Sequence, residues 1–114
     1  MEHKIQYSIV TYLRLHRILC IECDVMSGLQ FFPPKDSRRF AFIKHHQKMG
    51  YENGQPDLLL LLKGEVVFVE LKTEKGRQKP EQKKFQEAVE LLGFRYLLWR
   101  SLDDAIRFVK ELKG

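Results

Sequence analysis

The stretch 54–72, GQPDLLLLLKGEVVFVELK, constrains the fold of this chain more than any other stretch, because its pattern predicts a β-hairpin. Two apolar runs, 58–62 and 66–69, flank Lys63-Gly64, a dipeptide typical of a tight turn. Apolar residues occupy both alternating faces of each run, which is typical of a central strand pair covered on both sides. We therefore expect an α/β fold with a mixed central sheet flanked by helices.

The register of this hairpin predicts which polar side chains meet at its open end. If the loop has two residues, Leu62 pairs with Glu65, and counting back places Asp57 directly opposite Glu70. Side chains directly opposite each other have Cβ atoms about 4.5–5.5 Å apart. Lys72 points to the same face as Glu70, because strand side chains alternate with period 2. Opposed carboxylates destabilise a sheet, so we expect a divalent cation between them, with oxygen ligands suited to magnesium.

The same residues also have an ordinary structural interpretation. Pro56 and Asp57 both favour turns, so they fit a simple entry into a strand. Glu70 and Lys72 fit a solvated strand end equally well. Each feature is common alone, whereas their combination at this pairing favours a metal site.

The pattern G-x-P-D at 54–57, followed by E-L-K at 70–72, resembles the signature of the PD-(D/E)xK nucleases. Within that superfamily, the chain is most similar to the stand-alone VRR-NUC modules of phages and bacteria. The similarity extends over nearly the whole chain, including a closing strand and helix. An N-terminal Glu-x-x-x-Gln helix and a Pro-x-Gln helix start add to it, at Glu2, Gln6, Pro80 and Gln82.

This resemblance implies a restriction-endonuclease-like core and a DNA endonuclease that depends on Mg²⁺ or Mn²⁺. The implied metal ligands are Asp57, Glu70, the backbone carbonyl of Leu71 and, directly or through water, Glu2. Lys72 would orient or help to deprotonate the attacking water. Gln82 would support the active site or contact the DNA backbone, although ordinary helix solvation also explains it. Likewise, Glu2 is a carboxylate at a helix N-terminus, where the helix dipole favours negative charge.

The formal net charge of +5, with a pI near 9.3, favours a polyanionic partner without proving one. Basic residues lie directly after the strand that carries Glu70. They are the natural phosphate contacts, which supply affinity without sequence information: Lys75, Arg77, Lys79, Lys83 and Lys84. A second basic segment, 38–48, is either a solvated helix face or another phosphate-contacting surface.

The remaining elements follow from periodicity and capping signals in a chain of 114 residues, which we expect to form one domain over 1–114. We expect helices over 2–19, from Ser37 to about 49, and from Pro80 to Gly93. Strands are expected over 18–25 and 94–99. Ser101 and Asp104 resemble a capping box for a final helix.

Two other functional classes compete with a nuclease. A non-catalytic DNA-binding or assembly module would be expected to lack an acidic residue or the lysine of the hairpin, and all are present. A zinc-binding adaptor using Cys20 and Cys23 would need further ligands, since zinc takes four. That hypothesis also leaves the hairpin unexplained.

Assembly and location are expected as follows. The stretch 31–34, Phe-Phe-Pro-Pro, is a candidate subunit contact, because paired aromatic residues are seldom left in water on a small monomer. A homodimer would supply the two sites that symmetric cutting of two strands requires, and the resemblance points to branched or four-way-junction DNA. No apolar run approaches the roughly 20 residues that span a bilayer. We expect a cytoplasmic protein of a bacterial or phage-infected cell.

Overall fold

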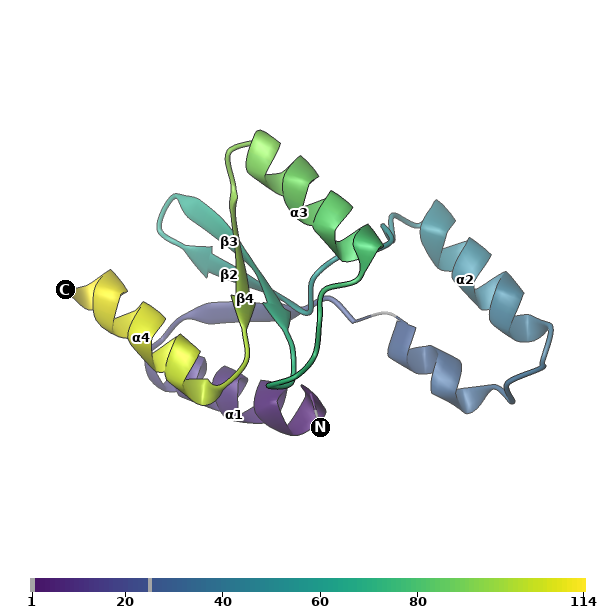
Figure 1. The fold of residues 1–114 in the computed structure, drawn as a ribbon, viewed down its shortest axis with the longest axis horizontal. Helices are drawn as coiled ribbons and strands as arrows, with labels where there is room; N and C mark the ends of the chain where they lie inside the picture. Colours follow the sequence, from purple (N-terminus) through teal and green to yellow (C-terminus); the bar gives the residue numbers. More distant parts are fainter. Residues whose placement is uncertain (1, 25) are drawn as a thin grey trace.

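The computed structural model describes residues 2–24 and 26–114, except the side chains of Glu2, His3 and Ser27. This part of the chain forms a mixed α/β fold (Figure 1). In chain order its elements are α1 (Glu2–Leu15), β1 (Leu19–Glu22), the 3-10 helix η1 (Met26–Phe31), α2 (Arg38–Lys48), β2 (Leu58–Leu62), β3 (Glu65–Leu71), α3 (Pro80–Leu91), β4 (Arg95–Trp99) and α4 (Leu102–Lys113).

The sheet has the strand order β1-β2-β3-β4. The first three strands are antiparallel neighbours, and β4 is parallel to β3 because α3 carries the chain back across the sheet. The predicted hairpin register is confirmed: Leu62 lies opposite Glu65, and the pairing continues to Leu58 opposite Val69. Gly64 has a φ of 73°, which explains why glycine suits the second position of this two-residue turn.

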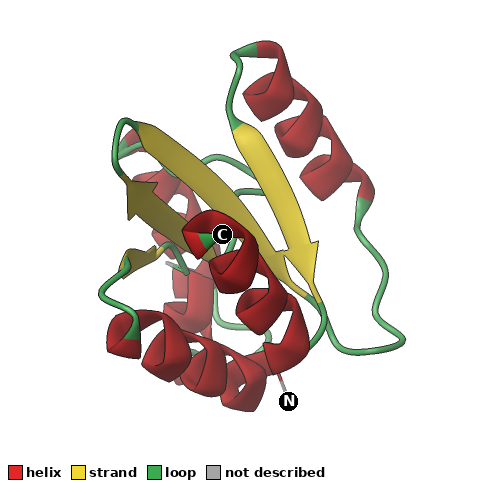
Figure 2. Ribbon diagram, turned by 90° about the vertical axis from the view of Figure 1, so that its left-hand side faces the viewer, coloured by secondary structure: helices red, strands yellow, loops and turns green. Residues whose placement is uncertain are grey.

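Helices cover the two faces of the sheet unequally. Figures 1 and 2 show α1 and α4 on one face, where they bury Leu60 and Val67 against Ile9 and Val109. On the other face lies α3, whose Phe85 ring contacts the Phe68 ring. The expectation of cover on both faces is therefore met only in part.

The uncovered part of the second face lies over β1. Leu19 is 61% exposed there, because α3 packs against β4, the strand at the opposite edge of the sheet. The neighbouring Ile21 is also exposed. The apolar pattern of the hairpin indicated sheet strands correctly, but α3 is too narrow to cover all of them.

Several predicted boundaries are too long at the N-terminal end. The first helix ends at Leu15 rather than at residue 19, and Arg17 adopts a positive φ of 59° before β1 begins. The strand predicted over 18–25 has only four residues. The chain then forms η1, which the sequence did not predict. Short irregular helices of this kind carry little hydrophobic periodicity.

The segment from η1 to α2 extends away from the sheet as an arm, here defined as residues 26–50 (Figure 1). Every residue of α2 is described, and none of them is buried. The helix predicted from Ser37 is confirmed, but the Ser37 side chain makes no capping hydrogen bond. The carboxylate of Asp36 instead accepts the Arg38 backbone N–H at 2.8 Å.

None of the described helices combines the length and the apolar character that crossing a membrane requires.

Candidate active site

The carboxylate of Glu70 lies near the end of β3 and is almost completely buried, with 1% of the residue exposed. Its Oε1 accepts two hydrogen bonds, one from the Tyr96 hydroxyl at 2.6 Å and one from Gln78 Nε2 at 3.0 Å. Gln78 Nε2 also donates to Gln86 Oε1 at 2.8 Å, which connects this network to α3. Neighbouring elements therefore hold Glu70 from two sides.

The second oxygen of this carboxylate is in a different position. Glu70 Oε2 is buried and has no hydrogen-bond partner among the described residues. Lys72 Nζ lies 3.7 Å from it, within ion-pair range but beyond hydrogen-bond distance. Lys72 is itself only 8% exposed. A buried carboxylate oxygen without a donor is costly, so this atom is free to take a cationic ligand.

Asp57 occupies the other strand of the hairpin, immediately before β2. Its backbone N–H donates to the Val69 carbonyl at 3.1 Å, and its Oδ2 accepts the Leu71 N–H at 2.7 Å. The regular strand pairing ends at Leu58. The carboxylate of Asp57 lies over the end of β3, where it bonds to Leu71, the residue that follows Glu70.

Both carboxylates affect the pKa of Tyr96. Burial raises the pKa of its hydroxyl, the hydrogen bond to Glu70 raises it further, and the charge of Asp57 adds to the effect. The phenol therefore stays protonated and keeps donating to Glu70. The structure brings Asp57, Glu70 and Lys72 to one end of the hairpin. The strand pairing ends with Leu58 opposite Val69, however, and Asp57 hydrogen-bonds to Val69 and Leu71, the two chain neighbours of Glu70.

The loop after β3 is held by Arg100. Its Nη1 donates to the carbonyls of Thr73 at 2.8 Å and of Gly76 at 2.6 Å. The Lys72 backbone N–H donates to the Trp99 carbonyl at 3.0 Å, which joins the same segment to β4. These hydrogen bonds hold the backbone at Lys72 and in the loop that follows it.

Gln82 has a structural task at the start of α3. Its Oε1 accepts the Lys79 N–H at 2.8 Å, which caps the helix, and this interaction explains why lysine at the cap position is tolerated. The glutamines in the Glu70 network are Gln78 and Gln86, which sequence reasoning missed. Tyr96, which completes this network from β4, is buried.

The remaining predicted site residues are Glu2 and the five basic residues after β3. Glu2 is the first residue of α1, and its side chain lies outside the described part of the chain. The five basic residues proposed to contact phosphates are all exposed: Lys75, Arg77, Lys79, Lys83 and Lys84. Their positions fit a solvent-facing surface next to the buried carboxylates.

The described side chains contain no group of three or more His, Cys, Asp and Glu residues arranged to hold a metal ion. The oxygen donors available are therefore the two carboxylates of Asp57 and Glu70 together with neighbouring carbonyls. Cys20 and Cys23 are free thiols. Burial raises the pKa of Cys23, and the charges of Asp57 and Glu22 raise it further. A zinc site would need Cys23 as a thiolate, whereas its surroundings favour the neutral thiol.

Comparison with known proteins finds similarity among solved structures. No family model matches the chain, and no curated protein matches it. Among solved structures, the chain is similar to a "VRR_NUC domain protein", with a TM-score of 0.54 and 20% sequence identity. The match covers 60% of each chain, so the chain spans about 60% of the length of that protein. At this identity the similarity concerns the fold, and the chain has a VRR-NUC-like fold.

Proposed function

We propose that this chain is a metal-dependent DNA endonuclease of the VRR-NUC type. The observation that carries the proposal is the buried Glu70 Oε2, which lacks a hydrogen-bond donor and lies beside Lys72. A fold has little reason to bury such an atom unless a ligand satisfies it. A carboxylate, a neighbouring aspartate and a lysine at one strand end are suited to the hydrolysis of a phosphodiester.

The oxygen donors fit Mg²⁺ or Mn²⁺, which prefer carboxylate and carbonyl ligands. Asp57 and Glu70 would hold the ion, with the Leu71 carbonyl and Glu2 as further ligands. When bound, such an ion polarises the scissile phosphate and lowers the pKa of a bound water.

The residues of the chain prepare this site in three ways. The hydrogen bonds from Tyr96 and Gln78 occupy Glu70 Oε1, so Oε2 is the oxygen left for a cation. The Leu71 N–H holds the carboxylate of Asp57 over the strand end. Lys72, buried and close to Glu70, would orient the attacking water and offset the negative charge of the transition state.

The DNA would lie across the exposed basic residues that follow β3, from Lys75 to Lys84. We further propose that the enzyme acts as a homodimer on branched DNA such as a four-way junction. Two symmetric sites would cut two strands. Phe31, which is 80% exposed, offers an apolar contact for a second subunit.

A nuclease assay with Mg²⁺, Mn²⁺ or EDTA tests the proposed function. The substrates are linear duplex, single-stranded, flap and four-way-junction DNA. We expect cleavage that EDTA abolishes. We also expect the variants Asp57→Asn, Glu70→Gln and Lys72→Ala each to lose at least about 10²–10³ in rate, because each removes an electrostatic contributor.

The Asp57→Asn variant is the most informative of the three. Its amide oxygen still accepts the Leu71 N–H, so the strand end keeps its structure while the charge is lost. Circular dichroism and thermal unfolding verify that it is folded. Strong cleavage by folded Asp57→Asn protein would contradict the proposal. DNA binding by wild-type protein without any cleavage would favour a non-catalytic DNA-binding module.

A further inference from the structure

The charge of the chain is concentrated in the arm. Residues 26–50 hold five lysines and arginines against one aspartate, so they account for +4 of the total net charge of +5. The rest of the chain is therefore nearly neutral. The basic residues of the arm are Lys35, Arg38, Arg39, Lys44 and Lys48.

The arm is stabilised by contacts between its own elements, η1 and α2. Arg39 Nη1 donates to the carbonyls of Leu29 at 2.7 Å and Phe32 at 3.1 Å, which joins α2 to η1. The Phe42 ring lies 5.9 Å from the Phe32 ring. Gly28 leaves room for this packing, since a Cβ there would lie 2.7 Å from the Phe42 ring. The arm therefore presents α2 in a defined orientation.

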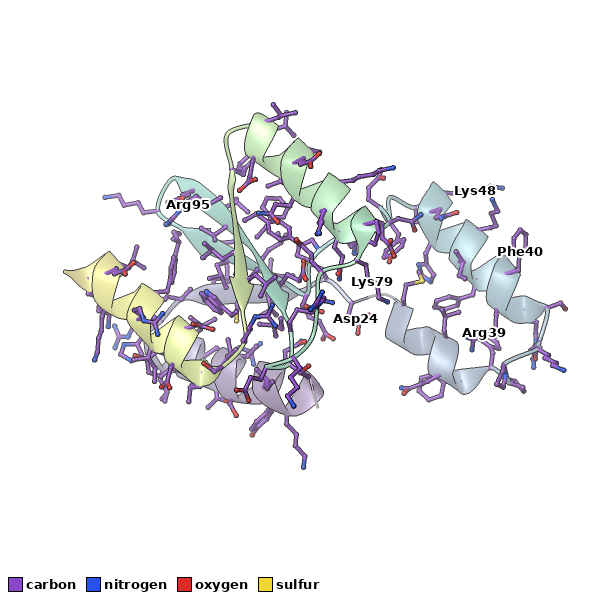
Figure 3. All side chains as sticks on the ribbon, viewed as in Figure 1. Asp24, Arg39, Phe40, Lys48, Lys79 and Arg95 are labelled. Carbon is purple, nitrogen blue, oxygen red and sulfur yellow. The ribbon has the colours of Figure 1, made fainter. Side chains whose placement is uncertain are left out.

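The outward face of α2 is basic, and among the described elements α2 contacts η1 alone. Lys44 and Lys48 are exposed and lie one helical turn apart, so they project from the same side. Phe40 is 67% exposed on the same stripe, with Lys44 Nζ 5.4 Å from its ring centroid. In Figure 3, Phe40 and Lys48 point outward from α2, whereas Arg39 points toward η1.

The chain segments before and after the arm are held at the candidate active site and at α3. The Cys23 N–H donates to the Asp57 carbonyl at 2.8 Å, and Gln55 Nε2 donates to the Cys23 carbonyl at 2.7 Å. Gly54 packs against the first turn of α3 so closely that a Cβ would lie 2.2 Å from the Glu81 carbonyl oxygen. The segment that follows the arm is thus held next to the helix that carries Lys83 and Lys84.

We infer that the outward face of α2 binds the phosphate backbone of the same DNA that the active site cleaves, away from the scissile bond. This inference rests on the proposed function. A second copy of this same face is the weaker fit, because Lys44 and Lys48 of one chain would repel Lys44 and Lys48 of the other. The helix is about 16 Å long at 1.5 Å per residue, long enough to follow several phosphates.

The double variant Lys44→Glu/Lys48→Glu tests this surface. The matched control, Lys63→Glu/Lys110→Glu, makes the same change in net charge at exposed lysines of the hairpin turn and of α4. The affinity for a fluorescent duplex is measured by anisotropy at several salt concentrations, with Ca²⁺ in place of Mg²⁺. Cleavage is measured under single-turnover conditions with saturating DNA and Mg²⁺.

We expect the α2 variant to bind DNA at least about tenfold more weakly than the control at low salt. Its plot of log affinity against log salt should be shallower by about 0.9 per lysine lost. The cleavage rate at saturating DNA should match that of the control, because α2 contacts only DNA away from the scissile bond.

Three results would overturn the inference. Equal affinities for the α2 variant and the control would show that α2 does not contact the DNA, while the proposed nuclease function would stand. A change in the molecular mass of the α2 variant by light scattering, with unchanged DNA affinity, would show that α2 contacts a second chain. Wild-type protein that neither binds nor cuts DNA would instead refute the proposed function, and this inference with it.

Discussion

The two oxygens of Glu70 differ in what surrounds them. Oε1 accepts hydrogen bonds from Tyr96 and Gln78, whereas Oε2 has only the more distant Lys72 ammonium beside it. Burying a charged group is tolerated when its partners are in place, and breaking such a network is costly. Tyr96 therefore orients the Glu70 carboxylate, because its hydroxyl bonds to Oε1, while Oε2 has no hydrogen-bond donor among the described residues.

Replacing Tyr96 with Phe should destabilise the fold and disturb the site. Removal of a hydroxyl that serves a buried acceptor costs about 1–3 kcal/mol. Tyr7→Phe is the matched control, because Tyr7 is exposed, and we expect its effect to stay within about 0.5 kcal/mol. Urea unfolding measures both values.

The pH dependence of stability supplies a second readout for this variant. The pKa of Tyr96 is higher in the folded state than in the unfolded state, where it is near 10. The protonated hydroxyl therefore contributes its full share to the free energy of unfolding below about pH 10, and this contribution is lost as the pH rises further. Wild type should therefore lose more stability than Tyr96→Phe as the pH rises above about 10. Parallel pH profiles would contradict this role.

At the scale of elements, two glycines flank strand β2 and have different reasons to be there. Gly64 lies in the hairpin turn with a φ of 73°, and a Cβ there would meet nothing within 4 Å. Gly54 has a φ of 82°, and a Cβ there would collide with the α3 backbone at Glu81. Both positions favour glycine for conformation, but only Gly54 is also required for packing.

Alanine substitution separates these two causes. Gly64→Ala should cost about 1–2 kcal/mol, because only the left-handed backbone is penalised. Gly54→Ala should lower the free energy of unfolding more than Gly64→Ala does, since the new Cβ collides with Glu81 and pushes the segment that follows the arm away from α3. Chemical denaturation gives the two free energies of unfolding. Equal losses would show that the Gly54 contact contributes nothing beyond its φ. If the arm contacts DNA, folded Gly54→Ala protein should also bind DNA more weakly than Gly64→Ala protein.

The whole molecule measures 50 × 30 × 26 Å, and the arm accounts for its elongation (Figure 1). A domain of this shape exposes much surface relative to its core. Large apolar side chains lie on that surface at Phe31 on η1 and at Leu91 at the end of α3. A contact with a second subunit would remove such side chains from water.

We predict a homodimer in which Phe31 contributes to the contact. Light scattering on a sizing column should give twice the chain mass of 13.6 kDa at micromolar concentration. Phe31→Ser should shift the equilibrium toward monomer, whereas Leu91→Ser, at a residue 88% exposed on another element, should leave the dimer intact. A 13.6 kDa species for wild type would refute the dimer. If Leu91→Ser gave monomers and Phe31→Ser stayed dimeric, the subunit contact would lie on α3 instead.

Local chemistry was enough to predict the hairpin, its register and the meeting of Asp57, Glu70 and Lys72. The alternation of side chains and the length of the turn are properties of neighbouring residues, so they can be counted along the chain. The capping of α4 was predictable for the same reason, and Asp104 Oδ2 accepts the Ser101 N–H at 3.2 Å.

Only the tertiary structure decided the rest of the site and the placement of the arm. Tyr96 and Arg100 contact Glu70 and the loop after β3 from 26 and 27 residues along the chain. Gln78 contacts Glu70 from that loop, and no local pattern marks any of the three as a partner. The arm was predicted as a basic helix, but its attachment to Asp57 and α3 depends on contacts between distant segments. The sequence determined which charged groups meet at the strand end, because pairing register is local. Packing determined which oxygen of Glu70 is left without a donor, because burial depends on the whole fold.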